Sequence, residues 1–283
     1  MTEPLSRPLH SAVVGDPSAP RRVAFLHGLF GRGKNFTRIA QGLEPEAQSL
    51  LLDLPNHGGS GWTGHFDYAE TADLVAAHLR GDSGDSGEGF ASGGQIDVVG
   101  HSMGGKVAMV LALRHPELVR RLVVIDIAPG ASVSSRSDFP RLLNALAGLD
   151  LAALERRVDA HERLREAIPD DAVRGFLLQN LRRTEPGRGE GSPGGFAWEP
   201  NLRLLHDEIA AVMGFPDLRG SAFDGPVLWM RGERSDYVAD ADAPAMRALF
   251  PRTRRMTVRG AGHWVHSEKP DEVIAALRAF LLV

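Results

Sequence analysis

The chain has 283 residues, of which 43% are hydrophobic, so it can bury a sizeable core in one large domain or two small ones. Its 32 basic and 36 acidic residues give a net charge of −4, which provides no electrostatic reason to expect nucleic acid or an anionic membrane as partner. It has no cysteine, which excludes disulfides, thiolate nucleophiles and cysteine-bound metals.

The N-terminal segment, MTEPLSRPLHSAVVGDPSAP, has no apolar run long enough for a signal peptide. No later stretch approaches the ~20 consecutive apolar residues of a membrane-spanning helix. We therefore expect a cytoplasmic protein that does not bind membranes. The sequence does not indicate its oligomeric state.

Short β-rich runs then alternate with helical patterns along most of the chain. The runs predict strands, and they cover residues 23–27, 49–53, 96–100, 122–127, 226–231 and 254–258. The helical patterns cover residues 68–80, 103–114, 241–250 and 270–282. Because continuous apolar strands are typical of sheets covered on both faces, this order predicts an α/β fold with a doubly wound, mostly parallel sheet.

Two segments interrupt the alternation. Residues 81–94 are rich in Gly, Ser and Asp and predict a surface loop. Residues 132–216 contain amphipathic patterns over 142–154, 151–168 and 171–181, but no convincing buried strand. We therefore predict a core formed by residues 1–131 and 217–283, with residues 132–216 as an inserted helical cap.

The sequence GHSMG at 100–104 fits the pattern G-x-S-x-G, in which the serine occupies a strained turn between a strand and a helix. A predicted strand ends directly before this turn, and a predicted helix begins directly after it. The helix start would direct N–H groups and the positive end of its dipole toward the reacting oxygen. We predict that Ser102 is a nucleophile and that the helical cap covers it; the alternative is a glycine-rich turn without chemistry.

A serine hydroxyl needs a base to accept its proton, and the chain has eleven histidines. His263 lies in GAGHW at 260–264, after the last predicted strand. That loop belongs at the carboxyl edge of a doubly wound sheet, beside Ser102. We predict that His263 is the base; His266, three residues later, is the alternative.

The oxyanion of the reaction needs two N–H donors. The loop HGLFG at 27–31 ends the first predicted strand and supplies one of them in this architecture, while the residue after the nucleophile supplies the other. We therefore predict the backbone N–H groups of Leu29 and Met103 as the oxyanion hole. Phe30 and Met103 flank it and are expected to line an apolar acyl pocket.

The sequence offers two carboxylates to orient the histidine. The usual place is the loop GERSDYV at 232–238, but Ser235 stands at the common position and Asp236 comes one residue later. Asp126 ends the preceding strand and could reach His263 from there. Since the acid has only to hold the imidazole tautomer and stabilise the imidazolium, both remain candidates.

Taken together, the motifs resemble those of the α/β-hydrolase superfamily across nearly the whole chain. The nearest resemblance is to a subgroup of small esterases that includes bacterial acyl-ester hydrolases and mitochondrial abhydrolase-domain proteins. The motifs that carry it are HGLFG (27–31), DLPNHGGS (53–60), GHSMGGK (100–106), IDIAP (125–129), GERSDYV (232–238) and GAGHWVHSEKP (260–270). In the cap only Trp198 and Asn201 match, and Trp198 is expected to contact substrate.

The resemblance implies a serine hydrolase that cleaves small-molecule carboxylic (acyl) esters through an acyl-enzyme, without metal or organic cofactor. It also implies a tetrad of Ser102, His263, Ser235 and Asp126, in which the second serine bridges acid and histidine. Asp236 is a departure, because relatives often lack a carboxylate there.

Other activities stay open within this resemblance. They include thioesterase, C–C hydrolase, lactonase and cofactor-free perhydrolase activity, whereas a serine nucleophile argues against dehalogenases and epoxide hydrolases that use an aspartate. From a different class, the alternative is a ligand-binding receptor on a hydrolase scaffold, because a fold does not by itself establish a function.

Overall fold

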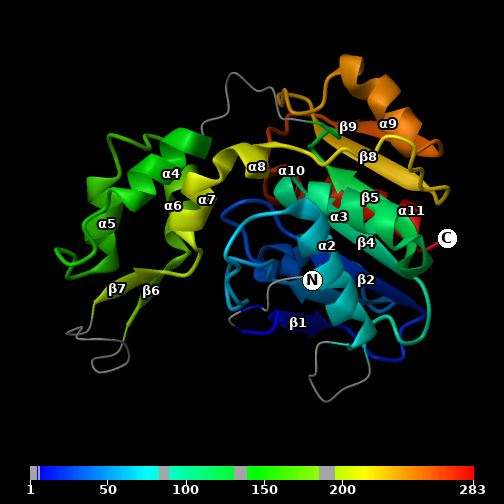
Figure 1. Cartoon of the computed structure of the whole chain (residues 1–283), viewed down its shortest axis with the longest axis horizontal. Helices are drawn as coiled ribbons and strands as arrows, with labels where there is room; N and C mark the ends of the chain where they lie inside the picture. The colour runs from blue at the N-terminus through cyan, green and yellow to red at the C-terminus, as the bar shows by residue number, and fades with distance from the viewer. Residues whose placement is uncertain (1–4, 6, 83–88, 131–138, 185–194) are drawn as a thin grey trace.

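The computed structural model describes residues 5, 7–82, 89–130, 139–184 and 195–283. In these residues a seven-stranded sheet with the strand order β1-β3-β2-β4-β5-β8-β9 forms the centre of the molecule (Figure 1). All neighbouring strands are parallel except β1 and β3. The strands are β1 (Ser11–Val14), β2 (Arg21–Leu26), β3 (Ala47–Leu52), β4 (Ile96–His101), β5 (Val119–Ile125), β8 (Val227–Gly232) and β9 (Thr253–Val258).

Both faces of the sheet are covered, which explains why its central strands are apolar without alternation. In β2, Ala24 and Leu26 belong to one apolar cluster, and Val23 and Phe25 belong to the other. The first cluster contains helices α2 (Tyr68–Arg80) and α3 (Met103–Arg114), and the second contains α1 (Thr37–Gln41) and α11 (Pro270–Leu281). The predicted α/β fold with a doubly wound, mostly parallel sheet is confirmed.

Several elements are too short for the sequence pattern to reveal. Strand β1 is half-exposed and pairs antiparallel with β3 at the edge of the sheet. Short helices η1 (Gly33–Phe36), η2 (Pro116–Leu118), η3 (Asp240–Asp242) and α10 (Val265–Glu268) occupy loops. Helix α9 (Ala243–Leu249) starts two residues later than the predicted 241.

Between β5 and β8 the chain leaves the sheet and forms a lobe beside its carboxyl edge (Figure 1). The lobe contains helices α4 (Phe139–Ala147), α5 (Arg157–Arg163), α6 (Asp171–Leu178), α7 (Leu202–Asp207) and α8 (Ile209–Met213). It also contains an antiparallel hairpin of β6 (Leu181–Arg183) and β7 (Phe196–Trp198). The expectation of helices alone was therefore wrong here, because three-residue strands leave no periodic pattern.

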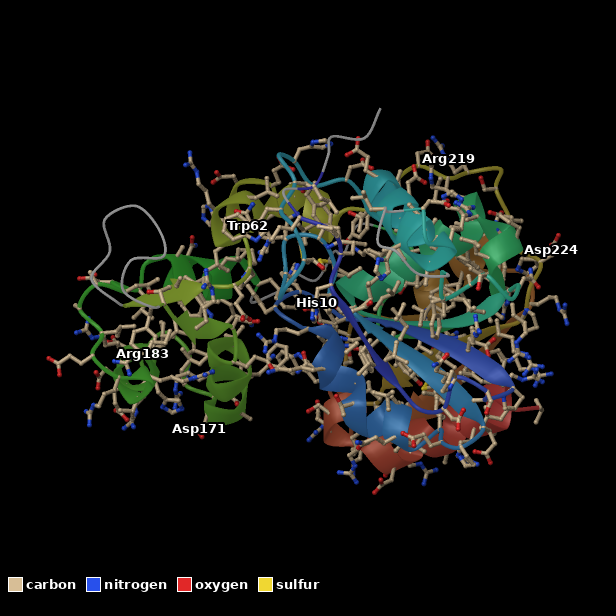
Figure 2. All side chains as sticks on the ribbon, turned by 90° about the horizontal axis from the view of Figure 1, so that it is seen from below. His10, Trp62, Asp171, Arg183, Arg219 and Asp224 are labelled. Carbon is tan, nitrogen blue, oxygen red and sulfur yellow. The ribbon has the colours of Figure 1, made fainter. Side chains whose placement is uncertain are left out.

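Some predicted features lie outside the described residues. These are the boundary at residues 131 and 132 and the centre of the loop at 83–88. Within the described residues, no helix has the length and apolar character needed to cross a membrane. Charged side chains of both signs lie on both lobes, as Asp171 and Arg183 on one and Arg219 and Asp224 on the other illustrate (Figure 2).

Helix α3 packs against β2 through backbone rather than side chains. A Cβ atom at Gly104 would lie 2.3 Å from the carbonyl oxygens of both Leu26 and His27. A methyl group there requires the helix to move away from the strand, and the turn that carries Ser102 lies at the start of this helix.

We predict that Gly104→Ala lowers the free energy of unfolding by at least about 2 kcal/mol, because the added methyl overpacks the contact between α3 and β2. Gly175→Ala is the matched control, since a Cβ at Gly175 in α6 has no heavy atom within 4 Å. That change should stabilise its helix by about 0.5–1 kcal/mol. Urea denaturation followed by circular dichroism measures both, and equal effects would contradict the packing argument.

Candidate active site

Ser102 occupies the turn between β4 and α3 in a backbone conformation that L-residues rarely adopt. Its φ is 53° and its ψ is −121°. Its N–H donates to the carbonyl oxygen of Ile125 at 3.0 Å, and its carbonyl oxygen accepts from the N–H of Lys106 at 3.1 Å. Strained residues of this kind persist where the surrounding structure holds them, and they cluster at functional sites.

His263 lies between Ser102 and a buried carboxylate. Its Nε2 is 3.0 Å from the Ser102 hydroxyl oxygen, and its Nδ1 is 2.8 Å from Oδ2 of Asp126. Since an ionised carboxylate can only accept, Nδ1 carries the hydrogen and Nε2 is left to accept the serine proton. Ser102 directly follows β4, Asp126 directly follows β5, and His263 lies in the loop after β9.

Three donors hold the Asp126 carboxylate, whose side chain is fully buried. The N–H of Gly232 donates to Oδ1 at 2.8 Å, while the Ser235 hydroxyl and His263 Nδ1 both donate to Oδ2. The backbone of Asp126 also has a positive φ, 56°, which turns the chain out of β5 toward the histidine. Hydrogen bonds to an ionised acceptor are about twice as strong as neutral ones, so the carboxylate is firmly oriented.

The structure distinguishes the two candidate acids by position. Asp126 contacts His263 directly, whereas Asp236 is exposed to solvent on the same loop as Ser235. Ser235 differs from the expected bridge: it donates to the carboxylate and does not lie between acid and imidazole. Ser235 therefore shares Oδ2 of Asp126 with His263 and helps to orient the carboxylate.

Aromatic rings cover the imidazole. Tyr237 stacks on His263 with ring centroids 4.1 Å apart and an interplanar angle of 30°, and Phe139 at the start of α4 lies edge-on at 6.1 Å. His101 donates from Nε2 to the carbonyl oxygen of His263 at 2.9 Å, which fixes the loop that carries the base. These contacts limit access of water to the pair of His263 and Asp126.

The loop at 27–31, which is predicted to supply an oxyanion donor, packs closely against Ser102. A Cβ at Gly28 would lie 2.9 Å from Nδ1 of His101 and 3.1 Å from Cβ of Ser102, so a side chain there would require the loop or its neighbours to shift. Leu29 and Met103 both line the small cavity at Ser102. The same cavity is lined by Tyr68, Lys106, Ile127, Phe139 and Tyr237.

Phe30 and Trp198, the two predicted substrate contacts, are placed outside the lining of this cavity. Phe30 is buried, and its ring centroid lies 6.2 Å from that of Phe139. Trp198 is half-buried at the end of β7.

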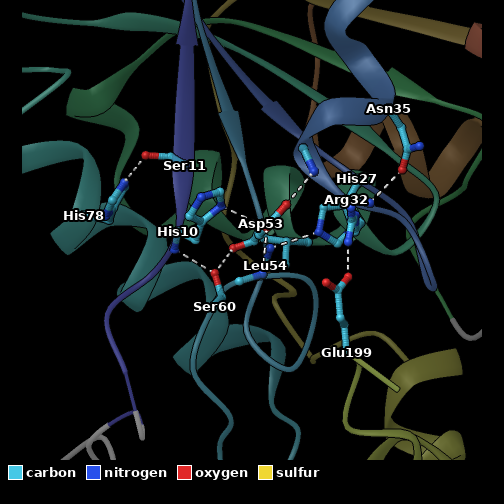
Figure 3. A network of polar contacts seen from close by, with 12 residues as sticks. His10, Ser11, His27, Arg32, Asn35, Asp53, Leu54, Ser60, His78 and Glu199 are labelled. Atoms are coloured by element: carbon cyan, nitrogen blue, oxygen red, sulfur yellow. Dashed lines mark hydrogen bonds and ion pairs between the residues drawn. The ribbon is translucent and has the colours of Figure 1, made fainter. Parts of the chain in front are cut away.

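A polar network centred on Asp53 fixes the oxyanion loop (Figure 3). The carboxylate accepts from the N–H groups of Gly33 at 2.7 Å and Gly59 at 2.9 Å. Nearby, His27 donates from Nδ1 to the carbonyl oxygen of Gly28 and accepts at Nε2 from the N–H of Leu54 at 3.0 Å. The loop that carries Leu29 is thus tied to the loop after β3.

The lobe formed by α4 to α8 also holds this loop, through contacts that no sequence motif predicts. The Asn180 side chain donates to the carbonyl oxygen of Phe30 at 2.7 Å, and the Asn35 side chain donates to Gln179 at 2.9 Å. Arg32 forms an ion pair with Glu199 (Figure 3). An isolated Asn or Arg outside a motif has no local signature of such a contact.

Four histidines near the site are buried, and burial lowers the pKa of each. A protonated ring would carry a charge that the protein interior does not hydrate, so the neutral form is favoured. Desolvation lowers the pKa of His57 and of His266 to about 3, and it lowers the pKa of His27 and His101 as well. His266, the alternative base, stacks on Phe36 at 4.6 Å and is not in contact with Ser102.

Among the described residues, no cluster of three or more His, Asp or Glu side chains is arranged to hold a metal ion.

Comparisons with known proteins show which family the fold belongs to. A family model described as the alpha/beta hydrolase fold matches residues 21–270. The sn-1-specific diacylglycerol lipase ABHD11 of Danio rerio is 34% identical over 92% of this chain and 78% of its own length. Esterase YbfF of Escherichia coli K12 is 29% identical over 92% of both chains. A solved marine microorganism esterase superposes with a TM-score of 0.86 at 30% identity, covering 98% of this chain and all of its own.

We predict that Asp126→Asn lowers kcat at least about a hundredfold, because an amide no longer selects the reactive histidine tautomer. Asp236→Asn is the matched control and should cost less than about tenfold. Ser235→Ala should fall between them, since the direct contact of Asp126 with His263 remains. Steady-state hydrolysis of a chromogenic ester measures all three. A crippled Asp236→Asn with a mild Asp126→Asn would reassign the acid.

The protein should also lose stability in acid because of its buried histidines. The folded-state pKa of His266, about 3, lies below the usual 6.5, so the unfolded chain binds the extra proton and stability falls as pH drops from about 6.5 toward 3. His266→Phe keeps the ring stacked on Phe36 and removes this titration. Between pH 8 and pH 5, we expect the variant to lose about 2 kcal/mol less unfolding free energy than the wild type. Parallel pH slopes in denaturant titrations would contradict this.

Proposed function

This chain belongs to the α/β-hydrolase family, and from that membership we propose that its esterase activity proceeds through a covalent acyl-enzyme on Ser102. The chain is a carboxylic ester hydrolase that acts on a small-molecule ester. The observation that carries the mechanism is the hydrogen-bonded series from the Ser102 hydroxyl through His263 to Asp126. A serine in a strained strand-to-helix turn with these partners is equipped for acyl transfer.

The reaction begins when Ser102 attacks the ester carbonyl and its hydroxyl proton moves to Nε2 of His263. The carbonyl π electrons move to the oxygen, and the backbone N–H groups of Leu29 and Met103 stabilise that oxyanion. Asp126 stays ionised and stabilises the imidazolium through its 2.8 Å contact with Nδ1. Ser235 and Gly232 keep the carboxylate oriented.

The tetrahedral intermediate collapses when the bond to the alcohol oxygen breaks and Nε2 of His263 gives that oxygen its proton. The acyl group is left as an ester on Ser102. Water then attacks this ester while His263 takes its proton, and the acid product leaves with the serine reprotonated. No step requires an oxidant, a reductant or a bound cofactor.

The proposal also includes the cap, the substrate contacts and the location that the sequence predicts. The lobe between β5 and β8 supports a cap at residues 132–216, because Phe139 on α4 contacts the His263 ring. Substrate contact by Phe30 and Trp198, absence of membrane binding and a cytoplasmic location remain predictions.

We expect Ser102→Ala to abolish labelling by a fluorophosphonate probe and to lower ester turnover by several orders of magnitude. The hydroxyl is lost without a change in packing, so circular dichroism and thermal melting should match the wild type. Ser18→Ala, at an exposed turn after β1, is the control and should keep both activities.

The panel for this test includes thioesters beside oxygen esters, since the same groups would serve both. Turnover of Ser102→Ala within tenfold of wild type would remove Ser102 as the nucleophile. Complete absence of turnover by a folded, labelled wild-type enzyme would instead favour a receptor on this scaffold.

A further inference from the structure

A second cavity lies at the opposite end of the strands from the catalytic site. Asp126 and His263 follow the carboxyl ends of the parallel strands β5 and β9, whereas this cavity lies at the amino ends of β5, β8 and β9, beside the last turn of α11. Figure 1 shows the C-terminus at this end of the sheet, away from the lobe of α4 to α8. The cavity is lined by Arg121, Pro226, Arg252, Thr253, Arg254, Ala279, Phe280 and Val283.

The size of this cavity is that of a ligand site. Its volume is about 410 Å³, within the range of about 300–1,000 Å³ that is usual for small-molecule pockets. We call it the arginine pocket, because three of its eight lining residues are arginines. The overall net charge of the chain is −4, so this positive charge is local.

The register of the strands brings two of the arginines to one level of the sheet. Leu122 of β5 pairs with Val227 of β8, and Val227 pairs with Thr253 of β9. Arg121 directly precedes Leu122, and Arg252 directly precedes Thr253. Residues 130 positions apart in the sequence therefore lie on either side of the amino end of β8.

The direction of the side chains places the third arginine with them. Arg121 lies two residues before Val123, and Arg254 lies two residues before Met256; both apolar residues belong to the cluster that contains α11. Because alternate residues of a strand share a face, both arginines lie on the α11 face of the sheet. The guanidinium carbon of Arg121 is 5.6 Å from the ring centroid of Phe280 in α11.

Little negative charge offsets these arginines. Among the residues that the structure describes, those that line the pocket include no Asp or Glu. In the same part of the chain Arg255 pairs with Asp240 at 2.7 Å, whereas Arg252 and Arg254 form no ion pair. Val283, the last residue, brings at most one carboxylate. The pocket therefore keeps an excess of positive charge.

The neighbouring Arg120 shows the difference that a partner makes. It donates from Nε to the buried carboxylate of Asp97 at 2.9 Å and from its guanidinium to the carbonyl oxygen of Leu281 at 2.6 Å. Burial, followed by the charge of Arg120, lowers the pKa of Arg121, and the charge of Arg254 acts in the same direction. The arginines thus repel one another, and a bound anion would offset that repulsion.

The chemistry of the lining indicates which anion fits. A guanidinium presents N–H donors in a planar fork that matches the oxygens of a phosphate or a carboxylate. Three such groups suit a doubly charged phosphate better than a singly charged carboxylate, and Pro226 and Phe280 offer apolar surface to an organic substituent. We propose that the pocket formed by Arg121, Arg252 and Arg254 binds a small phosphate monoester.

Calorimetric titration of the full-length protein with phenyl phosphate tests this site. We expect saturable single-site binding in the millimolar range or tighter, which weakens as salt is added because the arginines are partly exposed. Benzoate has the ring but one charge, and inorganic phosphate has the charge but no ring, so each should bind at least threefold more weakly. Equal binding of either ligand would overturn the choice of a phosphate monoester, and an isotherm without saturation would overturn the site.

Two double variants locate the binding. In Arg252→Gln/Arg254→Gln both altered side chains are exposed, so the fold should be kept, and Kd for phenyl phosphate should rise at least tenfold. Arg182→Gln/Arg203→Gln, at exposed positions of the lobe, removes the same charge and should leave Kd within twofold. An unchanged Kd in the first variant, or an equal rise in both, would overturn the proposal.

Ester hydrolysis distinguishes the arginine pocket from the catalytic site. Because the two lie at opposite ends of the strands, saturating phenyl phosphate should leave the KM for p-nitrophenyl acetate within twofold. Competitive inhibition that persists in Arg252→Gln/Arg254→Gln would place the ligand at Ser102 and overturn the proposal. The titration needs no catalysis, so absence of ester turnover would bear on the proposed function alone.

Discussion

The buried carboxylate of Asp126 is the contact on which the arrangement of the site depends. Asp126 directly follows β5. Its carboxylate accepts hydrogen bonds from the N–H of Gly232 at the end of β8, from the hydroxyl of Ser235 in the loop that follows, and from the ring of His263 in the loop after β9. One side chain therefore joins three segments that meet only in the folded protein. Each hydrogen bond to an ionised group contributes about 1.5–3 kcal/mol, so the loops are held by the same group that orients the base.

The lobe beside the sheet is part of this site and not an addition to it. Asn180 holds the backbone of Phe30 in the oxyanion loop, and Lys106 of α3 holds the end of α8. Phe139 of α4 lies against His263. The lobe therefore contacts His263, the loop that carries Leu29 and the helix that follows Ser102.

Local sequence patterns were sufficient where the chemistry depends on one continuous segment. The apolar runs predicted the parallel strands. The turn GHSMG indicated where one strand ends and the next helix begins, and in the structure β4 ends at His101 and α3 begins at Met103. The order of strands and helices then placed Ser102 and His263 at one edge of the sheet. These features follow from side-chain period and glycine sterics, which a sequence displays directly.

The sequence by itself determined the fold class, the nucleophile turn and the loop that presents the histidine, because each rests on a local pattern. Only the tertiary structure distinguished Asp126 from Asp236, since it places Oδ2 of Asp126 2.8 Å from Nδ1 of His263 and leaves Asp236 exposed. The same holds for the hydrogen bonds by which Lys106 and Tyr68 hold the end of α8. Contacts between residues more than a hundred positions apart leave no local pattern in a sequence, because only the folded chain brings such residues together.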